Sequence, residues 1–243
     1  MPQPIISIII PFFNRRRFLR SAVVSALQAR GPHREVIVVD DGSTDDGMGV
    51  LEGLPVVPIR HSRRLGMSEA RDSGRERARG EFVTFLDSDD QLSHDGLVHR
   101  LDLFRAVPQR NVVGGLVQVL GGDPLYVPPL LDKKTYLTSG GLPIALWSFI
   151  FRRDFLESLG KFDATLKVIP DSEFILRVLE RESIPFSKQV CVNYRVHGGQ
   201  ASIDPQTRQM SSRALAESIL LNWSLPDLQP LDCGDSDLSR PGY

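Results

Sequence analysis

The chain has 243 residues, of which 41% are hydrophobic and 24% charged, enough to bury the core of one large domain. A net charge of −1 and a pI near 6.5 give no general attraction for nucleic acid, so no nucleic-acid partner is expected. Cys191 and Cys233 form no CxxC pair, and we expect free thiols in a reducing compartment.

No stretch of the chain approaches the roughly 20 apolar residues that span a bilayer. The early "IISIIIP" lacks the basic leader and the small-residue cleavage site of a signal peptide. We therefore expect a cytoplasmic protein without a transmembrane segment, while peripheral contact with the inner membrane face stays open. The composition indicates no particular oligomeric state.

Strands and helices alternate over the first hundred residues. Residues Ile5 to Ile10 form a β-branched run that we expect to end at Pro11, and Arg16 to Ala29 carries apolar residues at helical spacing. The later predicted elements are strands at "EVIVV", "VVPIR" and "FVTFL", and helices from about 68 to 79 and from about 95.

This alternation predicts an α/β fold with a mostly parallel sheet covered on both faces. Ligands of such sheets bind beyond the carboxyl ends of the strands. Three polar segments follow strand ends directly, namely Pro11 to Asn14, Asp40 to Ser43 and Asp87 to Asp90. We expect them to converge on one edge of the sheet.

The alternation fades after about residue 111. The segment "NVVGGLVQVL" predicts a strand, whereas residues 121–141 are rich in Gly and Pro and remain unassigned. We expect a regular α/β half at 1–110, a less regular half at 111–223 and a loose tail at 224–243. The second half should contain helices at 171–182 and 211–221 and a strand at 188–196.

The stretch "FVTFLDSDD" raises a question of charge, because a buried strand is followed at once by Asp87, Asp89 and Asp90. Two unit charges about 4 Å apart repel by roughly 4 kcal/mol at an effective dielectric near 20. Solvent, an arginine, a helix N-terminus or a metal ion must offset that repulsion. An isolated "DSDD" would favour a plain turn that caps the next helix.

Five segments in one order decide against the plain turn: "SIIIPFFN", "VIVVDDGSTD", "GMSEARDSG", "GEFVTFLDSDD" and "YRVHGGQAS". Together they resemble a family 2 glycosyltransferase over nearly the whole chain except its tail. The resemblance implies the GT-A fold, a nucleotide-binding sheet flanked by helices with a smaller irregular acceptor lobe. It also implies a nucleotide-sugar donor and a divalent metal at the strand ends.

The resemblance assigns the metal site to the D-x-D pattern of Asp87, Ser88 and Asp89. Asp89 is then the direct ligand of Mn²⁺ or Mg²⁺, Asp87 contacts metal or ribose, and Asp90 supports them. Such cations commonly use only one or two protein carboxylates besides phosphate oxygens. His197 matches a family position that approaches metal or diphosphate, although a lone loop histidine is as often simply exposed.

The resemblance also assigns the donor pocket. Asp41 would accept a hydrogen bond from the nucleobase, and Asp40 would support its loop. Arg71 would lie near base and phosphates. The remaining expected pocket residues are Pro11, Phe12, Phe13 and Asn14, with Phe13 at a position where the family often has tyrosine.

The helix at 68–79 carries Ala70, Gly74 and Ala78 at intervals of four, a stripe that lets it lie close on the sheet. Arg64 and Asp72 depart from the asparagines common in the family, which affects nucleotide contacts rather than the fold. We expect solvated arginines at 75, 77 and 79 and at 15, 16 and 17.

An inverting transferase needs a carboxylate that takes the proton of the acceptor hydroxyl. The family supplies it from an acidic pair at a helix start, six residues before an arginine, and "PDSEFILR" puts Asp171 six before Arg177. Pro170 replaces the usual preceding glutamate. Asp171 is therefore the expected base, Glu173 is the second choice, and the alternative is that Asp171 only caps its helix.

The predicted function is metal-dependent, inverting transfer of a sugar from a UDP-sugar to a glycan, lipid-linked or small-molecule acceptor. Trp147 and Phe149 could stack on a sugar, but core positions are expected. The rivals are a non-catalytic sugar-nucleotide binding module and a sugar nucleotidyltransferase, whose Gly-rich basic loop is missing after the first strand. A dehydrogenase and a P-loop protein are not expected, because neither GxGxxG nor GxxxxGK[ST] follows a predicted strand.

Overall fold

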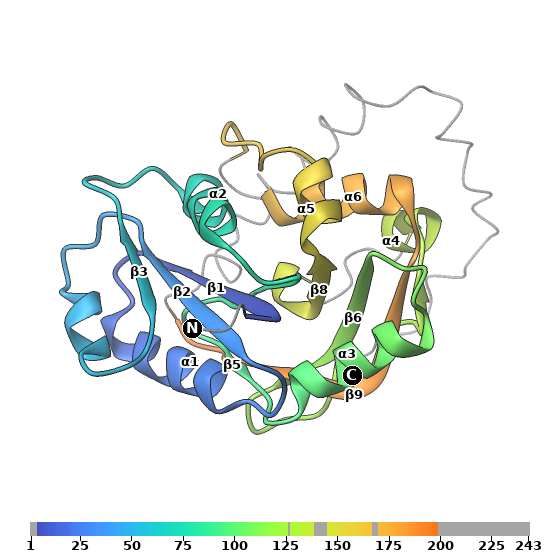
Figure 1. The fold of residues 1–243 in the computed structure, drawn as a ribbon, viewed down its shortest axis with the longest axis horizontal. Coiled ribbons are helices and arrows are strands. Elements are labelled where there is room, and N and C mark those ends of the chain that lie inside the picture. Colours follow the sequence, from blue (N-terminus) through green and yellow to red (C-terminus); the bar gives the residue numbers. More distant parts are fainter. Residues whose placement is uncertain (1–3, 126, 139–144, 167–169, 199–243) are drawn as a thin grey trace, which may run out of the picture.

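The computed structural model describes residues 4–125, 127–138, 145–166 and 170–198 and has the predicted α/β architecture (Figure 1). Within these residues nine strands pair in the order β3-β2-β1-β4-β8-β6-β9-β5, with β7 added to β9. The strands are β1 (Ile6–Phe12), β2 (Arg34–Asp40), β3 (Val57–Arg60), β4 (Phe82–Phe85), β5 (Gln91–Leu92), β6 (Val112–Val119), β7 (Leu130–Leu131), β8 (Phe149–Arg152) and β9 (Ile184–Tyr194).

Helices cover both faces of this sheet. The helices are α1 (Arg16–Gln28), α2 (Met67–Arg77), α3 (Gly96–Ala106), α4 (Lys133–Thr138), α5 (Arg153–Ser158) and α6 (Pro170–Arg181), with 3-10 helices η1 (Gly47–Leu51) and η2 (Leu146–Ser148). Figure 1 shows α1 and α3 on one side of the sheet and α2, α5 and α6 on the other. The two apolar cores divide in the same way.

Strand β1 lies at the centre of the parallel part of the sheet. All seven of its residues are buried, as expected for a strand covered on both faces. Contrary to the predicted stop, the strand continues through Pro11, which pairs with Val39 of β2, to Phe12. Its parallel pairing with β2 and β4 brings the ends of all three strands to one edge.

The second half of the chain extends this sheet, which the sequence pattern did not reveal. Strand β8 pairs antiparallel with both β4 and β6, so it joins the two halves of the sheet. Trp147 is 6% exposed and Phe149 is fully buried, which confirms their core positions. The predicted helix at 211–221 and the tail at 224–243 lie outside the described residues.

Helix α2 packs closely on the sheet through its small residues. Ala70 is 1% exposed and Ala78 is 7% exposed, and a Cβ atom added to Gly74 would lie 2.3 Å from Cγ2 of Ile9 in β1. A contact that short is far inside van der Waals distance, so any side chain at this position must push helix and strand apart. The small-residue stripe is therefore a packing device.

We expect Gly74→Ala to lower the free energy of unfolding by about 1–2 kcal/mol, because overpacking costs about 1–3 kcal/mol and the gain in helix propensity returns part of it. Chemical denaturation measures the change. Arg77→Ala on the exposed side of α2 is the matched control and should stay within about 0.5 kcal/mol of the parent. A stabilised Gly74→Ala protein would contradict the close packing.

Two further expectations can be compared with the described residues. None of the helices found there has the length and apolar character needed to cross a bilayer. Cys191 is a buried free thiol, as predicted, whereas Cys233 lies outside the described residues.

Candidate active site

The loops after β1 and β2 are tied together at the predicted edge of the sheet. Asn14 has a positive φ of 51°, a conformation that asparagine tolerates better than most residues. Its backbone N–H donates to Ser43 Oγ at 3.0 Å, and its Oδ1 accepts from the Thr44 amide at 2.9 Å. Asp40 accepts from the Ser43 amide at 2.8 Å and pairs with Arg60 at 3.3 Å, so its side chain holds this loop.

The four residues expected to line a nucleotide pocket divide into two groups. Pro11 and Phe12 lie inside β1, and Phe12 is 1% exposed in the core, so its side chain does not face a pocket as expected. Phe13 is half-buried and Asn14 is exposed. The guanidinium carbon of Arg64 lies 4.3 Å from the centre of the Phe13 ring, which is a cation–π contact.

Asp41 organises the segment that precedes α2. Its Oδ1 accepts from the Leu65 amide and its Oδ2 from the Gly66 amide, both at 2.8 Å. Nδ1 of His61 lies 2.9 Å from Oδ1 as well. Asp41 is only 3% exposed, so this buried carboxylate joins the end of β2 to the start of α2.

The acidic cluster after β4 carries a real electrostatic penalty. Burial raises the pKa of Asp87 to about 7, with repulsion from Asp171 and Asp89 opposing the favourable effect of Arg71. Burial, followed by repulsion from Asp87, raises the pKa of Asp90 to about 8. The folded state therefore holds protons that the unfolded chain has lost, so these groups lower stability as the pH rises from about 4 to about 8.

Asp89 and Asp90 have different surroundings within this cluster. Asp90 is 1% exposed; its Oδ1 accepts from the Arg195 amide at 2.8 Å, and its Oδ2 has no hydrogen-bond partner in the described part of the chain. Asp89 is reached by Nε2 of His197 at 3.0 Å from Oδ2 and by Nε of Arg15 at 3.6 Å. The structure thus brings His197 to the D-x-D pattern.

Arg15 is not the solvated arginine that we expected. Its side chain is 31% exposed, and its ion pair with Asp89 places it at the acidic cluster. Arg16 does lie in solvent, where it pairs with Asp46, while Asp45 Oδ2 accepts the Arg16 backbone N–H at 2.8 Å and so satisfies the first turn of α1.

A cavity of about 650 Å³ opens beside Asp89 on the α1 side. His197 enters it from the loop after β9, where its ring packs 4.5 Å from that of Phe18. The cavity is strongly basic and lies next to the acidic cluster. Its lining consists of Asn14, Arg15, Arg16, Arg17, Phe18, Asp45, Val50, His197 and Gly198.

On the other side of the cluster, Arg71 bridges the two halves of the chain. Its Nη1 and Nη2 both donate to Asp171, the second at 3.3 Å, and Nη2 lies 3.6 Å from Oδ1 of Asp87. The arginine is 3% exposed. Burial alone lowers the pKa of Arg71, but the two carboxylates outweigh it and raise the pKa above its ordinary value.

Asp171 points toward Arg71 rather than along its own helix. It lies in the first turn of α6, after Pro170, and its Oδ2 is also 3.5 Å from the Leu146 amide. These contacts all leave the helix, so capping alone does not describe this side chain. Glu173, the second candidate base, is bound instead through both carboxylate oxygens to Arg177 at 2.7 Å.

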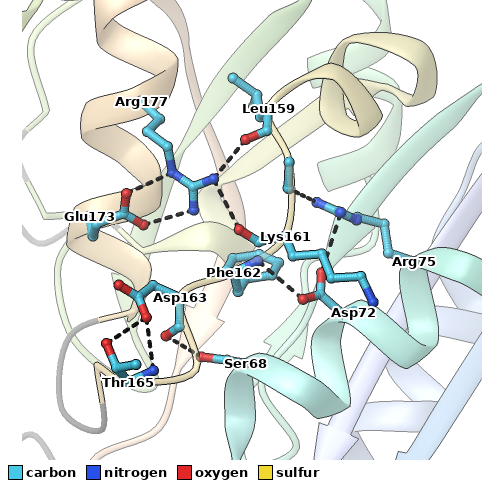
Figure 2. Close-up of polar contacts among 11 residues, drawn as sticks. Ser68, Asp72, Arg75, Leu159, Lys161, Phe162, Asp163, Thr165, Glu173 and Arg177 are labelled. Carbon is cyan, nitrogen blue, oxygen red and sulfur yellow. Dashed lines mark hydrogen bonds and ion pairs between the residues drawn. The ribbon is translucent and has the colours of Figure 1, made fainter.

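Figure 2 shows how the segment before α6 is held between α2 and α6. Arg177 donates to the carbonyl oxygens of Leu159 at 2.6 Å and Lys161 at 3.0 Å. Phe162 stacks on Phe174 of α6, with ring centres 4.2 Å apart. The Glu173–Arg177 pair therefore has a structural task in docking α6.

Two expectations about α2 need correction on the same view (Figure 2). Arg75 is not solvated: it is 8% exposed and donates to Gly160 O at 2.7 Å. Asp72, at a position where asparagine is common, accepts from the Phe162 amide at 3.1 Å and so faces the chain rather than a nucleotide. Arg79 is exposed but pairs with Glu35, while Arg77 is exposed as expected.

Sequence reasoning missed several residues at this site. Arg15 and His61 contact Asp89 and Asp41, and Arg195 holds Asp90 through its backbone N–H. The indole of Trp147 lies near Asp87 and lowers the pKa of that carboxyl. Proximity to a recognised motif was a usable signal for Arg15, but nothing local marked Trp147.

Comparison with known families identifies this arrangement. The family model described as Glycosyl transferase family 2 matches residues 7–163, which include the loops after β1, β2 and β4 and all of α2. The chain belongs to glycosyl transferase family 2. Asp171 and His197 follow the matched segment.

Relatives of this family 2 chain carry the same general description. An uncharacterized glycosyltransferase of Bacillus subtilis, EpsJ, is 28% identical over 191 residues, covering 71% of this chain and 55% of EpsJ. An uncharacterized glycosyltransferase of Haemophilus influenzae is 34% identical over 111 residues, covering 42% of this chain and 43% of that protein. The chain thus spans about half the length of these relatives.

Solved structures confirm the predicted GT-A fold of this family 2 chain. The Staphylococcus aureus protein TarS, residues 1–349, in complex with UDP-GlcNAc superimposes with a TM-score of 0.68 at 22% identity. The match covers 88% of this chain and 66% of that structure. TarS residues 1–349 have also been solved with UDP, at a TM-score of 0.66.

Proposed function

We propose that this chain catalyses transfer of a sugar from a UDP-sugar to an acceptor hydroxyl with inversion at the anomeric carbon. One observation carries the proposal: Arg71 joins Asp171 of α6 to Asp87 of the acidic cluster. A carboxylate that can take a proton and a carboxylate that could hold a metal ion beside the diphosphate thus contact one buried guanidinium. Family membership supports the reaction class, and the UDP-GlcNAc complex of TarS supports the donor class.

The donor would lie along the edge formed by the loops after β1, β2 and β4. Phe13 offers a ring face to the nucleobase, and Asn14 lines the adjoining surface. Asp41 holds the segment at Leu65 and Gly66 that would border the base, and Ser88 stands between the two aspartates of the D-x-D pattern. Arg71 contributes positive charge toward the phosphates.

The residues after β4 fit a divalent cation. Asp87 and Asp89 offer the oxygen donors that Mn²⁺ and Mg²⁺ prefer. Burial, together with repulsion between the carboxylates, raises the pKa values of Asp87 and Asp90, and a cation would relieve that repulsion. In the described part of the chain no three acidic, histidine or cysteine side chains are already arranged around a common point. The donor set therefore suits an ion that completes its shell with diphosphate oxygens.

Asp89 and Asp87 would hold the ion, with His197 beside Asp89. A bound ion neutralises the charge of the departing diphosphate. The protein itself contributes Arg71 on one side of the cluster, and Arg15 with its neighbours in the basic cavity on the other. Both arginines would strengthen diphosphate binding by direct charge.

Asp171 is the proposed general base. As the acceptor oxygen attacks the anomeric carbon from the face opposite the diphosphate, its proton passes to an Oδ atom of Asp171. Arg71 orients that carboxylate. Glu173 is less suited because both of its oxygens are bound to Arg177.

The acceptor class stays broad: a glycan, a lipid-linked saccharide or a small molecule. We propose a cytoplasmic location with peripheral membrane contact in the lipid-linked case. A thermal-shift series with UDP, UDP-glucose and UDP-GlcNAc, each with and without Mn²⁺, tests the donor class, because a ligand that binds only the folded state raises its stability. No shift with any nucleotide would contradict the proposal.

One observation favours a non-catalytic sugar-nucleotide binding module instead. Both carboxylate oxygens of Asp171 accept hydrogen bonds from Arg71, so the candidate base is engaged before any acceptor arrives. Metal-dependent release of UDP from a UDP-sugar separates the two functions, since a binding module has no turnover.

We expect Asp41→Ala to weaken UDP binding by about 1–3 kcal/mol, the usual cost of leaving buried hydrogen-bonding groups unpaired. The amides of Leu65 and Gly66 lose their acceptor, so the segment before α2 is no longer held at the pocket. Calorimetric titration of UDP measures the loss. Asp46→Ala, at an exposed position of the same loop, should bind UDP as the parent does.

A further inference from the structure

The 3-10 helix η2 faces both carboxylates that the proposed mechanism uses. The backbone N–H of Leu146 lies 3.5 Å from Oδ2 of Asp171. The side chain of Trp147 lies near Asp87 and lowers the pKa of that carboxyl. Trp147 is 6% exposed and its ring stacks on Tyr194, with ring centres 5.9 Å apart. A short turn of three residues thus contacts the acidic cluster and the candidate base together.

The carbonyl side of this turn rests on Arg100, which is fully buried. Nη1 of Arg100 donates to the carbonyl oxygen of Trp147 at 3.0 Å and to that of Phe149 at 3.5 Å. Nε donates to Gly96 O, one turn earlier in α3, at 3.0 Å, which fixes the direction of the side chain. Arg100 therefore spans from α3 to the backbone on either side of Ser148.

A buried guanidinium in these surroundings is costly. No carboxylate pairs with Arg100 within the described residues, and its Nη2 lacks a hydrogen-bond partner there. The nearby Cys191 is not a counter-ion, because burial raises the pKa of this thiol. The guanidinium stays charged at all ordinary pH values. A methionine of similar length would fill the space without that cost.

The neighbouring chain makes room for this arginine. A Cβ atom added to Gly115 of β6 would lie 3.2 Å from Cδ of Arg100 and 2.3 Å from Sγ of Cys191. Only glycine leaves space for both side chains under the sheet. Gly115 therefore accommodates Arg100, although an apolar residue at position 100 would stabilise the fold equally well.

We propose that Arg100 is a positioning residue of the transferase site, which holds η2 by its carbonyl oxygens and thereby keeps the indole of Trp147 on Asp87. This inference rests on the proposed function for its role in donor binding. The structural part, that Arg100 fixes Trp147, stands independently of which reaction the chain performs.

The first test follows Trp147 directly and needs no donor. The chain has two tryptophans, so Trp223→Phe leaves Trp147 as the only indole. In that background Arg100→Met should shift the emission of Trp147 to longer wavelength and raise acrylamide quenching about twofold, because a released indole meets more water. Unchanged emission and quenching would overturn the proposal.

The second test is a double-mutant cycle on UDP binding with Mn²⁺, measured by calorimetry. Arg100→Met should weaken binding about tenfold, a typical coupling for residues in one network, but less than about twofold when Trp147 is already phenylalanine. Equal losses in both backgrounds would show that Arg100 does not act through Trp147. If the parent protein does not bind UDP, the proposed function is wrong, but the fluorescence result remains valid.

Two further variants guard against a folding defect. Arg105→Met on the exposed side of α3 is the matched control and should change neither readout. Arg100→Lys keeps the charge but not the planar donor set, so it should fold and give an intermediate emission shift. An Arg100→Lys protein that folds with parental emission and parental UDP affinity would also contradict the proposal.

Discussion

Asp89→Asn is expected to reduce metal-dependent sugar transfer by at least about 10³-fold, because a metal-bound site supplies several kcal/mol of charge stabilisation. The substitution keeps the size of the side chain and removes the negative charge. Nε2 of His197 lies 3.0 Å from Oδ2 of Asp89, and it can still hydrogen-bond to the asparagine oxygen. The measurement is the initial transfer rate across a Mn²⁺ titration.

The fold should survive this change. The negative charge of Asp89 helps to raise the pKa values of Asp87 and Asp90, so its loss relieves repulsion on both carboxyls. The lost contact with Arg15 is partly exposed and is worth about 1 kcal/mol or less. Asp46→Asn, an exposed ion-pair partner of Arg16, is the control and should retain parental activity. Near-parental turnover by Asp89→Asn would contradict the assignment of the D-x-D pattern as the metal site.

Asp171→Asn is expected to reduce transfer by about 10² to 10⁴-fold, the usual worth of acid–base catalysis. Asparagine fills the same space but takes no proton from the acceptor. UDP affinity should change less than about tenfold, since the loss falls on the chemical step. Transfer rates beside calorimetric UDP binding check both parts.

The structure adds a stability cost to this variant that capping alone would not give. Arg71 is 3% exposed and would keep only Asp87 as a charged partner, so we expect a loss of about 1–3 kcal/mol in the free energy of unfolding. Asp171 itself is partly exposed, which keeps this figure below that of a fully buried pair.

Glu173→Gln is the matched comparison in the same helical turn. It breaks the pair with Arg177 and should lower stability, but it should reduce transfer less than about tenfold if Asp171 is the base. Two outcomes reassign the chemistry. A larger loss in Glu173→Gln makes Glu173 the base, and near-parental transfer by both variants favours another proton acceptor.

Much of the fold followed from local pattern. The helices α1, α2 and α6 begin and end within a few residues of their predicted limits, and α3 begins close to its predicted start. The strands β1 and β2 were also predicted from the sequence, because continuous β-branched runs suit strands buried on both faces. The stripe of Ala70, Gly74 and Ala78 correctly predicted close packing on the sheet.

Other features could not be predicted from local sequence pattern. Strand β8 is only four residues long, and its antiparallel place between β4 and β6 depends on partners far away in the chain. Pro11 looked like a strand end because proline lacks a donor, yet β1 continues past it. Arg75 looked solvated because its carbonyl partners come from a loop about eighty residues later.

The sequence by itself determined that Asp40 ends a parallel strand and that Asp41, Asp87 and Asp89 follow strand ends. Parallel strands of one sheet bring those ends to the same edge. The tertiary structure alone decided which charges meet: Asp171 and Asp87 with Arg71, and Asp89 with Arg15. The reason is physical, since a strand or helix is specified by spacing within a few residues. An ion pair across a hundred residues is specified only when packing fixes strand order and helix docking, and burial then sets the energy of each charge.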